Sequence, residues 1–419
     1  MAFSYSALKD LLQEDGRDDL IDQVDNSTAL VDWKMTDDGP KNQAKVFEVM
    51  RSTDVGRVQV DNSGFASQGF AVDGGNRRTA AQATYASGTY GYAILEGNAE
   101  FPEGIVRVAR GGDGIDLYEQ AMAKLGRQFA RLTERAVLGH ELAKPENSET
   151  NGSNVVVEVT SIAGFQIGGL VDIYASDGTT LKQANAEVTV ITDDGDGTGA
   201  VTIATLNSTV GGGILNTDRI FLAGSGGANA VASASTPRCV NLQDVTTSGI
   251  ALYAGLAAGD QPAGTLDSTT TSWSNASGKR MMQRIFRACG EKPTHLIVDP
   301  YQEQKIYESQ NPTLRHAPGD TLDQYAPRME FDGCPVVVTN AQNSKRVDFV
   351  NAKAYSAKLH VFWEPSPTGD GGKSAGWSRE ALQLSQTKLA WTLFCSAGIN
   401  MRVPRRNAFG AMSNLNAAF

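Results

Sequence analysis

The sequence predicts an α+β protein built from several modules, one of which is a small all-β domain inserted near the middle of the chain. Its 419 residues exceed what a single hydrophobic core usually organises. Its 44 glycines favour many short strands joined by tight turns over a bundle of helices. Residues 144–153 and 224–236 have the composition of linkers, and they enclose a series of short strand-like segments.

Residues 1–40 are expected to form an N-terminal arm. The first 26 residues carry seven acidic side chains against two basic ones, Lys9 and Arg17. Apolar residues recur there at helical spacing in two short pieces, and helices this short are marginal in water on their own. The arm therefore either folds against a partner surface or is a solvated acidic tail.

Residues 41–100 are predicted to form an extended β-hairpin loop. Strand-forming residues such as Val46, Phe47 and Tyr90 are separated by polar stretches that contain glycine. A two-stranded ribbon is marginal in water when it packs on nothing else, so we expect the loop to lie on another surface. Between residues 41 and 95 the basic residues outnumber the acidic ones by six to four; the basic residues are Lys41, Lys45, Arg51, Arg57, Arg77 and Arg78.

Residues 101–145 are assigned to a peripheral domain that contains the clearest helix, from about Asp116 to Leu138. Apolar residues recur every three or four positions on one face of this helix. Polar residues, including Glu134 and Arg135, are expected on the opposite side, and Gly139 is a natural stop. At about 1.5 Å per residue the helix would be about 35 Å long, which suits a structural spine.

Residues 146–236 are predicted to form the inserted β-rich domain, a small sandwich or barrel. Short strands are expected at residues 155–159, 170–174, 188–191, 201–203 and 219–222. The stretch from Asp193 to Gly199 resembles the beginning of a calcium loop, but Thr205 occupies the position of the closing glutamate. A hairpin turn is the favoured interpretation, since Asp-Gly pairs commonly mark turns.

Residues 237–350 are predicted to form an axial α/β domain, and residues 351–419 are predicted to supply further strands to the peripheral domain. The axial domain is expected to contain a helix near residues 278–289, a strand at 294–298 and a helix that begins at Asp299-Pro300. In the final segment the alternation of apolar residues shifts by one position, which predicts a β-bulge near residues 386–388.

Composition and charge exclude several classes of protein. The net charge of −10 argues against binding nucleic acid through a broad basic face. No run of about 18 apolar residues occurs, and the first residues lack the features of a secretion signal, so we expect a protein made and used in a cytoplasm, without membrane association. No cofactor or metal is expected. The cysteines lack metal-ligand spacing and should be buried, reduced thiols; they are Cys239, Cys289, Cys334 and Cys395.

Catalytic motifs are absent from the sequence. It contains no Gly-x-Ser-x-Gly elbow, no Walker phosphate loop, no His-Glu-x-x-His motif and no dinucleotide-binding glycine pattern between a strand and a helix. The expected role is therefore structural and not enzymatic. The alternative is an enzyme whose site is built from residues far apart in the sequence.

The order of these modules resembles the major capsid proteins of tailed double-stranded DNA bacteriophages, a fold family that also includes the floor domains of herpesvirus capsids. The resemblance covers nearly the whole chain. Residues 115–138 resemble the spine helix of that family, and residues 293–300 (Pro-Thr-His-Leu-Ile-Val-Asp-Pro) resemble part of its axial domain. Residues 400–410 resemble the end of its terminal strand set. The β-rich domain of residues 146–236 departs from the minimal pattern of the family.

This resemblance implies a subunit that self-assembles as pentamers and hexamers into an icosahedral shell around packaged double-stranded DNA, which its inner face contacts non-specifically. The arm and the loop would hold neighbouring subunits together. Further implied partners are a scaffolding protein, a portal and a decoration protein. The implied location is the virion, assembled in the cytoplasm of a host bacterium. The alternative is a phage tail or surface β-rich binding protein, in which the inserted domain would recognise the ligand.

The distribution of charge predicts one particular contact between subunits. Acidic residues of the arm, namely Asp15, Asp18, Asp19 and Asp22, are predicted to dock on basic residues of a neighbour's loop, namely Arg51, Arg57, Arg77 and Arg78. The alternative is that both surfaces are independently solvated, because exposed ion pairs contribute little free energy.

Overall fold

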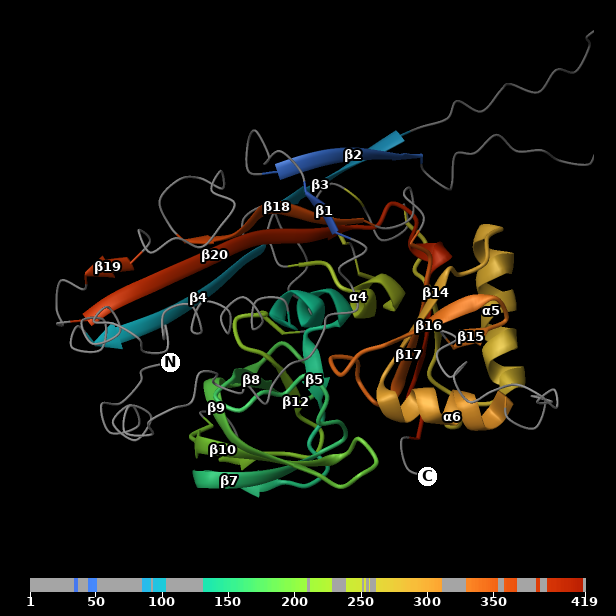
Figure 1. Ribbon diagram of the computed structural model, residues 1–419. Coiled ribbons are helices and arrows are strands. Elements are labelled where there is room, and N and C mark those ends of the chain that lie inside the picture. Colours follow the sequence, from blue (N-terminus) through green and yellow to red (C-terminus); the bar gives the residue numbers. More distant parts are fainter. Residues whose placement is uncertain are drawn as a thin grey trace, which may run out of the picture.

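The structure of the chain is a computed structural model (Figure 1). It describes residues 34–36, 44–50, 85–91, 93–102, 131–208, 212–227, 239–250, 252–253, 256, 261–310, 329–352, 358–367, 382–384 and 390–416. Within these residues, no helix has the length and apolar character needed to cross a membrane.

A five-stranded sheet extends across the top of the molecule in Figure 1. Its long strand β20 pairs with β4 along one edge and with β18 and β19 along the other. The short strand β1 pairs in parallel with β18 and brings the N-terminal part of the chain to this sheet. The strands are β1 (Lys34–Thr36), β4 (Ala93–Pro102), β18 (Lys358–Pro367), β19 (Leu382–Leu384) and β20 (Ala390–Arg402).

The predicted bulge near residues 386–388 is wrong. Strands β19 and β20 are antiparallel neighbours, with Leu382 opposite Leu393 and Leu384 opposite Trp391. The apolar alternation therefore restarts on a second strand that runs in the opposite direction, and a bulge within one continuous strand would not produce this pairing.

The end of the spine helix packs on this sheet, as predicted. Residues 131–138 are helical, and the helix ends before Gly139. Its last residues share a buried cluster with side chains of β4, β20 and the short helix α4 (Leu242–Thr246). The cluster includes Val137, Leu138, Ala93, Ile399, Met401 and Val245. The predicted part of the helix before residue 131 lies outside the described residues.

Residues 141–222 form a six-stranded sheet with the strand order β5-β12-β8-β9-β10-β7. Pro145, just after β5, bridges to Val159 at the end of β7, and the Glu146 N–H donates to the Glu158 carbonyl at 2.8 Å. The two edges of the sheet therefore meet in a small barrel, drawn in green in Figure 1. The strands are β5 (Glu141–Ala143), β7 (Gly152–Val159), β8 (Leu170–Tyr174), β9 (Leu181–Asp193), β10 (Gly199–Leu206) and β12 (Arg219–Leu222).

The interior of this barrel follows from the alternation in its strands. Along β10, residues Val201 and Ile203 point inward and are about 1% exposed, whereas Thr202 between them is half-buried. Lys182 enters the barrel and forms a buried ion pair with Asp218 at 2.6 Å. The stretch Asp193 to Gly199 joins β9 to β10 as a hairpin turn, which confirms that prediction. The two-residue strands β6 (Glu149–Thr150) and β11 (Gly213–Ile214) pair beside the barrel.

A second six-stranded sheet, with the order β13-β21-β17-β14-β16-β15, forms the axial part of the chain. Helices α5 (Asn275–Cys289) and α6 (Pro300–Gln310) cover one of its faces, where Ile285 and Ile306 pack on Leu296. The opposite face, represented by Ile297, joins the cluster of the spine helix. The strands are β13 (Thr265–Asp267), β14 (His295–Val298), β15 (Glu330–Phe331), β16 (Cys334–Val338), β17 (Arg346–Val350) and β21 (Gly410–Ser413).

The axial sheet also takes a strand from the end of the chain. Strand β21 pairs with β17 and with β13, although the sequence assigns residues 351–419 to the peripheral domain. Between the two sheets, the segment η5 (Arg406–Ala408) buries Arg406, whose guanidinium donates to the carbonyls of Asp244 and Thr247. The C-terminal segment therefore connects the peripheral sheet to the axial sheet.

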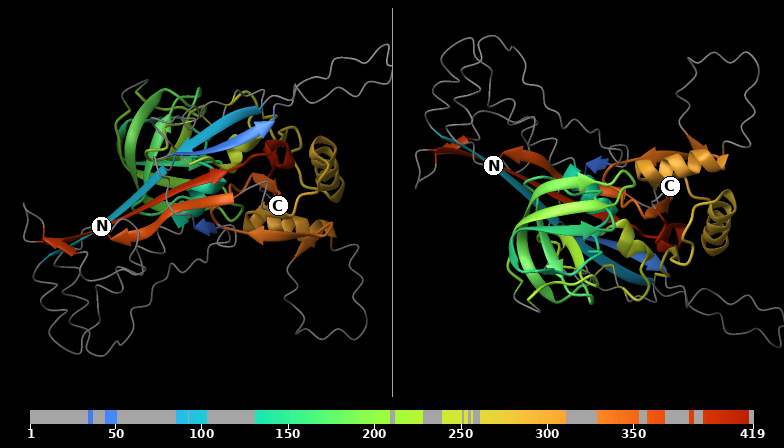
Figure 2. Two further views of the ribbon diagram at one scale, coloured as in Figure 1. Left: turned by 90° about the horizontal axis from the view of Figure 1, so that it is seen from above. Right: turned by 90° about the horizontal axis from the view of Figure 1, so that it is seen from below.

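The two remaining strands, β2 (Ala44–Met50) and β3 (Tyr85–Gly91), form a two-stranded ribbon. They are antiparallel over their full lengths, from Ala44 opposite Gly91 to Met50 opposite Tyr85. The ribbon leads away from the rest of the described chain (Figures 1 and 2). This pairing confirms the base of the two-stranded loop that the sequence predicts. Residues 51–84 of the loop lie outside the described part of the chain.

Three cysteines are described as free thiols. Cys239 and Cys334 are buried, as expected from the sequence, whereas Cys289 at the end of α5 is only half-buried.

Candidate functional site

The residues predicted to carry the contact between subunits lie outside the described part of the chain. This holds for Asp15, Asp18, Asp19 and Asp22 in the arm, and for Arg51, Arg57, Arg77 and Arg78 in the loop. The structure therefore does not bring them together or separate them, and the contact stays a prediction.

The β2–β3 ribbon is the described feature that bears most directly on assembly. Its two strands pair only with each other among the described strands. Such a ribbon gains little stability by itself, because a sheet of only two strands is marginal in water. A ribbon of this kind is stabilised when it lies on another surface, such as that of a neighbouring subunit.

A buried arginine joins the three modules of the subunit. Arg135, in the last turns of the spine helix, is 3% exposed. Its Nη2 donates to the Glu141 carbonyl in the barrel at 2.6 Å, and its Nη1 donates to the Ala341 carbonyl in the axial domain. Burial lowers the pKa of Arg135 to about 10, while the nearby Glu141 raises it. The side chain therefore ties the helix to both other modules.

The prediction that Glu134 and Arg135 lie on the exposed polar side of the helix is wrong. Glu134 is 4% exposed, because the barrel and the axial domain enclose this end of the helix. Helical periodicity separates the polar side of a helix from its apolar side. It does not show which polar side chains will be buried by later segments of the chain. No local signal in the sequence distinguishes Arg135 from the other arginines of the helix.

A loop between β16 and β17 holds the barrel against the axial domain. The Asn343 side chain donates to the Leu142 carbonyl at 3.1 Å. Ser344 donates its N–H to Ser161 Oγ at 3.2 Å and its hydroxyl to the Gly197 carbonyl at 3.2 Å. These bonds reach both the start of the barrel and its β9–β10 turn, so the barrel is anchored at two points.

The start of α6 provides a third anchor. The Tyr301 hydroxyl donates to Asp193 Oδ2 at 2.7 Å, which raises the pKa of Tyr301 to about 12. Asp299, which precedes the helix, is 4% exposed. Burial raises the pKa of Asp299 to about 7; the Tyr301 N–H, donating to Oδ2 at 3.1 Å, lowers it, and the charge of Asp193 raises it. This junction therefore contains a carboxyl group that changes protonation near neutral pH.

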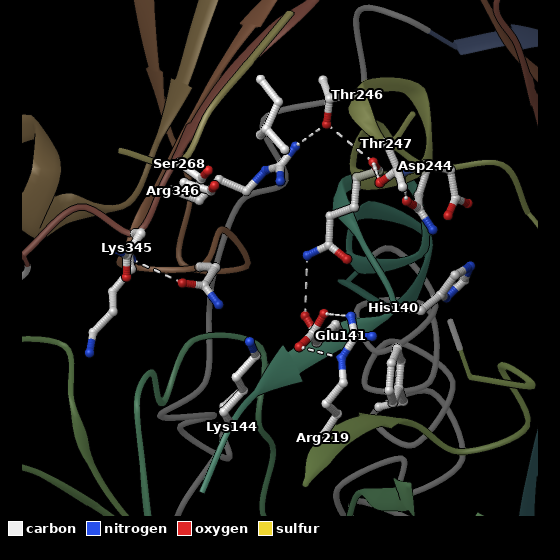
Figure 3. A pocket seen from close by; sticks show the side chains of 18 of the residues that line it. His140, Glu141, Lys144, Arg219, Asp244, Thr246, Thr247, Ser268, Lys345 and Arg346 are labelled. Atoms are coloured by element: carbon white, nitrogen blue, oxygen red, sulfur yellow. Dashed lines mark hydrogen bonds and ion pairs between the residues drawn. The ribbon is translucent and has the colours of Figure 1, made fainter. Parts of the chain in front are cut away.

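A polar cleft of about 820 Å³ lies between the barrel and the axial domain (Figure 3). Lys144 and Arg219 line it from the barrel, and Lys345 and Arg346 line it from the axial domain. Arg219 forms a two-bond ion pair with Glu141, with Nε to Oε1 at 3.0 Å, and Arg346 is paired with Asp348 at 2.8 Å. Both arginines of the cleft are therefore neutralised by carboxylates of their own modules.

The chemistry of the described residues is that of a structural junction. Among them, no group of three or more His, Cys, Asp or Glu side chains could hold a metal ion. Of the ion pairs that line the cleft, Arg219–Glu141 links two strands of the barrel and Arg346–Asp348 lies within β17. The calcium-like stretch from Asp193 to Gly199 is used as a turn that docks on α6. The arrangement fixes how the barrel, the spine helix and the axial domain are oriented in one subunit.

Comparison with known proteins supports the fold that the sequence predicts. No sequence-family model matches the chain, and no curated protein matches it. Among solved structures, a chain of the cyanophage A-1(L) capsid matches with a TM-score of 0.57 at 10% identity, over 99% of this chain and 100% of that chain. The capsid of an empty GTA particle matches with a TM-score of 0.49 at 9% identity, over 96% and 95% of the two chains. The capsid of the Myoviridae phage XM1 matches with a TM-score of 0.47 at 8% identity, over 97% and 98%.

The cyanophage match spans both chains almost completely, so it covers the sheets, the barrel region and the ribbon together. It agrees with the mixture of helix and sheet in the structure. The capsid fold predicted from the sequence is confirmed, since the chain has the fold of this phage capsid chain, whereas the assignment of residues 146–236 as an inserted domain stays a prediction.

Proposed function

We propose that this protein is the structural subunit of an icosahedral shell that encloses packaged double-stranded DNA, and that it assembles with itself as pentamers and hexamers. The observation that carries the proposal is the β2–β3 ribbon, which leads away from the subunit and pairs with no other described strand. A neighbouring subunit would supply the surface that the ribbon lacks.

The mechanism is the repetition of one set of contacts. Each subunit lays its ribbon on one neighbour and receives the ribbon of another, so a closed shell contains many copies of a weak contact. Simultaneous contacts hold a subunit far more strongly than any single contact does, because release requires all of them to open together. The junction formed by Arg135 and the β16–β17 loop gives each subunit the fixed shape that this repetition needs.

The arm and the loop would add a contact based on charge. In the proposed shell, Asp15, Asp18, Asp19 and Asp22 of one subunit dock on Arg51, Arg57, Arg77 and Arg78 of the next. Reversal of Arg77 and Arg78 to glutamate is expected to impair assembly while the subunit stays folded. Normal shells from this variant would contradict the contact.

The proposed location is the virion, after assembly in the cytoplasm of a host bacterium. The net charge of −10 fits an inner surface that touches DNA without binding it tightly, because like charges repel at short range. A scaffolding protein and a portal are proposed as assembly partners. The barrel of residues 141–222 is proposed to project outward or to bridge neighbours, and a decoration protein is its proposed partner.

Electron microscopy of the purified chain tests the proposal, first with the chain expressed alone and then with the genes that adjoin its own. Closed icosahedral particles, or rings of five and six subunits, are the expected result. Persistent monomers in both preparations, or tubes and fibres, would overturn the proposal and would favour a tail or surface binding protein.

A further inference from the structure

Helix α5 presents a basic surface on an acidic protein. Its 15 residues include Lys279, Arg280, Arg284 and Arg287 and no acidic residue, whereas the whole chain has a net charge of −10. All four basic side chains are exposed. The helix is firmly built, with a capping box at Ser274, and its inner face buries residues that include Met281, Met282 and Ile285. We call the exposed side, formed by the four basic residues and Phe286, the α5 surface.

Little in the described part of the chain neutralises the α5 surface. Arg284 lies 3.8 Å from Asp267, whose carboxylate already accepts hydrogen bonds from Thr269 and Thr270. The side chains of Lys279, Arg280 and Arg287 have no hydrogen bond or ion pair with any residue that the structure describes. Arg280, Arg284 and Arg287 follow each other at helical spacing and form a row about 10 Å long.

An exposed aromatic side chain belongs to the same surface. Phe286 is 52% exposed and lies seven residues after Lys279, which places the two side chains on the same side of the helix. Arginine and aromatic residues together are typical of protein–protein contacts, whereas phosphate contacts need only the cations. The composition of the α5 surface therefore favours a protein partner.

The described chain contains a surface of opposite charge. The β9–β10 turn carries Asp193, Asp194 and Asp196 within four residues, and Asp193 and Asp194 are exposed. Asp193 is held by the Tyr301 hydroxyl, and Asp196 accepts a hydrogen bond from the Thr198 N–H at 2.9 Å. The carboxylate of Asp194 has no partner among the described residues. We call these three aspartates the acidic turn.

The two surfaces lie at opposite ends of α6, so they do not meet within one subunit. The acidic turn contacts Tyr301 at the start of α6. The first residue of α5, Asn275, exchanges hydrogen bonds with Ser309 at the other end of α6, at 2.8 and 3.0 Å. Tyr301 and Ser309 are eight residues apart on α6, which separates these contacts by about 12 Å along the helix. Figures 1 and 2 agree with this placement, since the barrel and α5 lie on different sides of the axial sheet.

We propose that the α5 surface of one subunit contacts the acidic turn of the next subunit around each pentamer or hexamer. The inference rests on the proposed function, because it assigns one contact of the ring. A ring of identical subunits joins two different surfaces of each subunit, and that is the arrangement that these two surfaces offer. A second copy of the chain supplies one acidic turn for every α5 surface, so the charges match in number as well as in sign.

The test uses charge-reversed variants of the full chain. The first carries Arg280→Glu, Arg284→Glu and Arg287→Glu in α5, so its α5 surface becomes net acidic. The second carries Thr192→Lys, Asp194→Lys and Asp196→Asn, so its turn becomes net basic while Asp193 keeps its hydrogen bonds and residue 196 keeps an oxygen that accepts from Thr198. A control, Lys144→Glu with Lys292→Glu, changes the charge in the same direction as the first variant at two other exposed lysines.

Each charge-reversed variant alone should need at least about tenfold more protein than the control to form rings, because like charges then face each other at every contact. Circular dichroism should show that both variants stay folded. Raising the ionic strength should weaken ring formation by the unmodified chain, since exposed charges are screened.

Mixing the two variants gives the sharpest result. In an alternating ring, the acidic α5 of one variant meets the basic turn of the other, and the basic α5 of the second meets the acidic turn of the first. Alternation requires an even number of subunits, so the mixture should form hexamers and no pentamers. One chain with all six substitutions should form both.

Three results would overturn the inference. The first is ring formation by both variants at the concentration that the control needs. The second is a mixture that behaves like its separate components. The third is normal rings from the α5 variant with weaker binding to duplex DNA, which would assign the α5 surface to nucleic acid. Absence of rings from the unmodified chain would overturn the proposed function itself, so the two failures are distinguishable.

Discussion

Asp299 connects the protonation state of one carboxyl group to the strength of the junction between barrel and axial domain. The group is 4% exposed, and burial raises its pKa from the ordinary 3.8 to about 7. Between these values the folded protein keeps a proton that the unfolded chain releases. Because the unfolded state then binds fewer protons, the free energy of unfolding falls as the pH rises from about 4 to about 7. Asp299→Asn carries a neutral side chain of similar shape at every pH and removes this dependence.

The magnitude follows from the two pKa values. A pKa of about 7 instead of 3.8 corresponds to a loss of at most about 4 kcal/mol by pH 8. Below about pH 4 the aspartic acid is neutral in the folded and in the unfolded chain, so the variant and the unmodified chain should be about equally stable there. At pH 8 the free energy of the opening reactions that expose this residue should be higher in the variant, by up to about 4 kcal/mol.

Hydrogen exchange of the α6 amides, corrected for the intrinsic effect of pH, measures these opening free energies in unassembled subunits. Asp194→Asn is the control, because its carboxylate is exposed on the neighbouring turn and should leave the exchange of α6 unchanged. The reasoning is refuted if the protection of α6 in the unmodified chain is the same at pH 5 and pH 8. It is equally refuted if Asp299→Asn retains the full dependence on pH.

Three further predictions concern the barrel and its anchors. Gly197→Ala should lower the stability of the β9–β10 turn by about 1–3 kcal/mol, because the new Cβ would lie 2.8 Å from Ser344 Cβ in a backbone with φ of +83°. Hydrogen exchange of this turn measures the loss. The control Gly195→Ala, with a similar φ but open space around the new Cβ, should lower the stability less. Lys182→Met should lower the free energy of unfolding, measured by denaturant titration, by about 3–5 kcal/mol, because it leaves Asp218 charged and without its ion-pair partner in the interior. The double variant Lys182→Met with Asp218→Asn should lose less. Equal losses in the two variants would contradict this mechanism. Arg135→Met removes the donor to the Ala341 carbonyl and one of two donors to the Glu141 carbonyl, and it should cost about 1–3 kcal/mol; limited proteolysis near residues 141–144 should become faster, and an unchanged rate would argue against this role of Arg135.

Local signals in the sequence were sufficient for much of the fold. Strands β8 and β12 have the predicted ends, because β-branched and aromatic residues at these positions are bounded by turn-forming residues. The Asp332-Gly333 turn has positive φ at both residues, a conformation that Asp and Gly adopt readily, so this pair of residues is a local turn signal. Such features depend on a few neighbouring residues and are therefore visible in a single sequence.

Features set by distant parts of the chain were not visible. The β19–β20 pairing was misread as a bulge because a shift in alternation is the same whether one strand bends or a second strand begins. Strand β21 lies in the axial sheet because it pairs with β17, about 60 residues earlier in the chain, and no local pattern encodes that choice. β5, at three residues, is too short to show an alternation of its own.

The candidate site was predictable only in part for the same reason. The paired base of the loop followed from its strand-forming residues, and it is confirmed in β2 and β3. The junction around Arg135 depends on carbonyl groups, which every residue has, so side-chain patterns do not reveal it. The acidic arm and the basic loop are evident in the sequence as opposite charges, and their contact awaits the test of the charge-reversed loop.

The two anchors of the barrel have a mechanical consequence. Hydrogen bonds hold its first strand and its β9–β10 turn to the same loop of the axial domain, so a rotation of that domain carries the barrel with it. The orientation of the barrel then follows the orientation of the axial domain. A pair of fluorescent labels, one at the exposed Ser176 of each of two adjacent subunits, would report the angle between their axial domains as the proposed shell forms or expands.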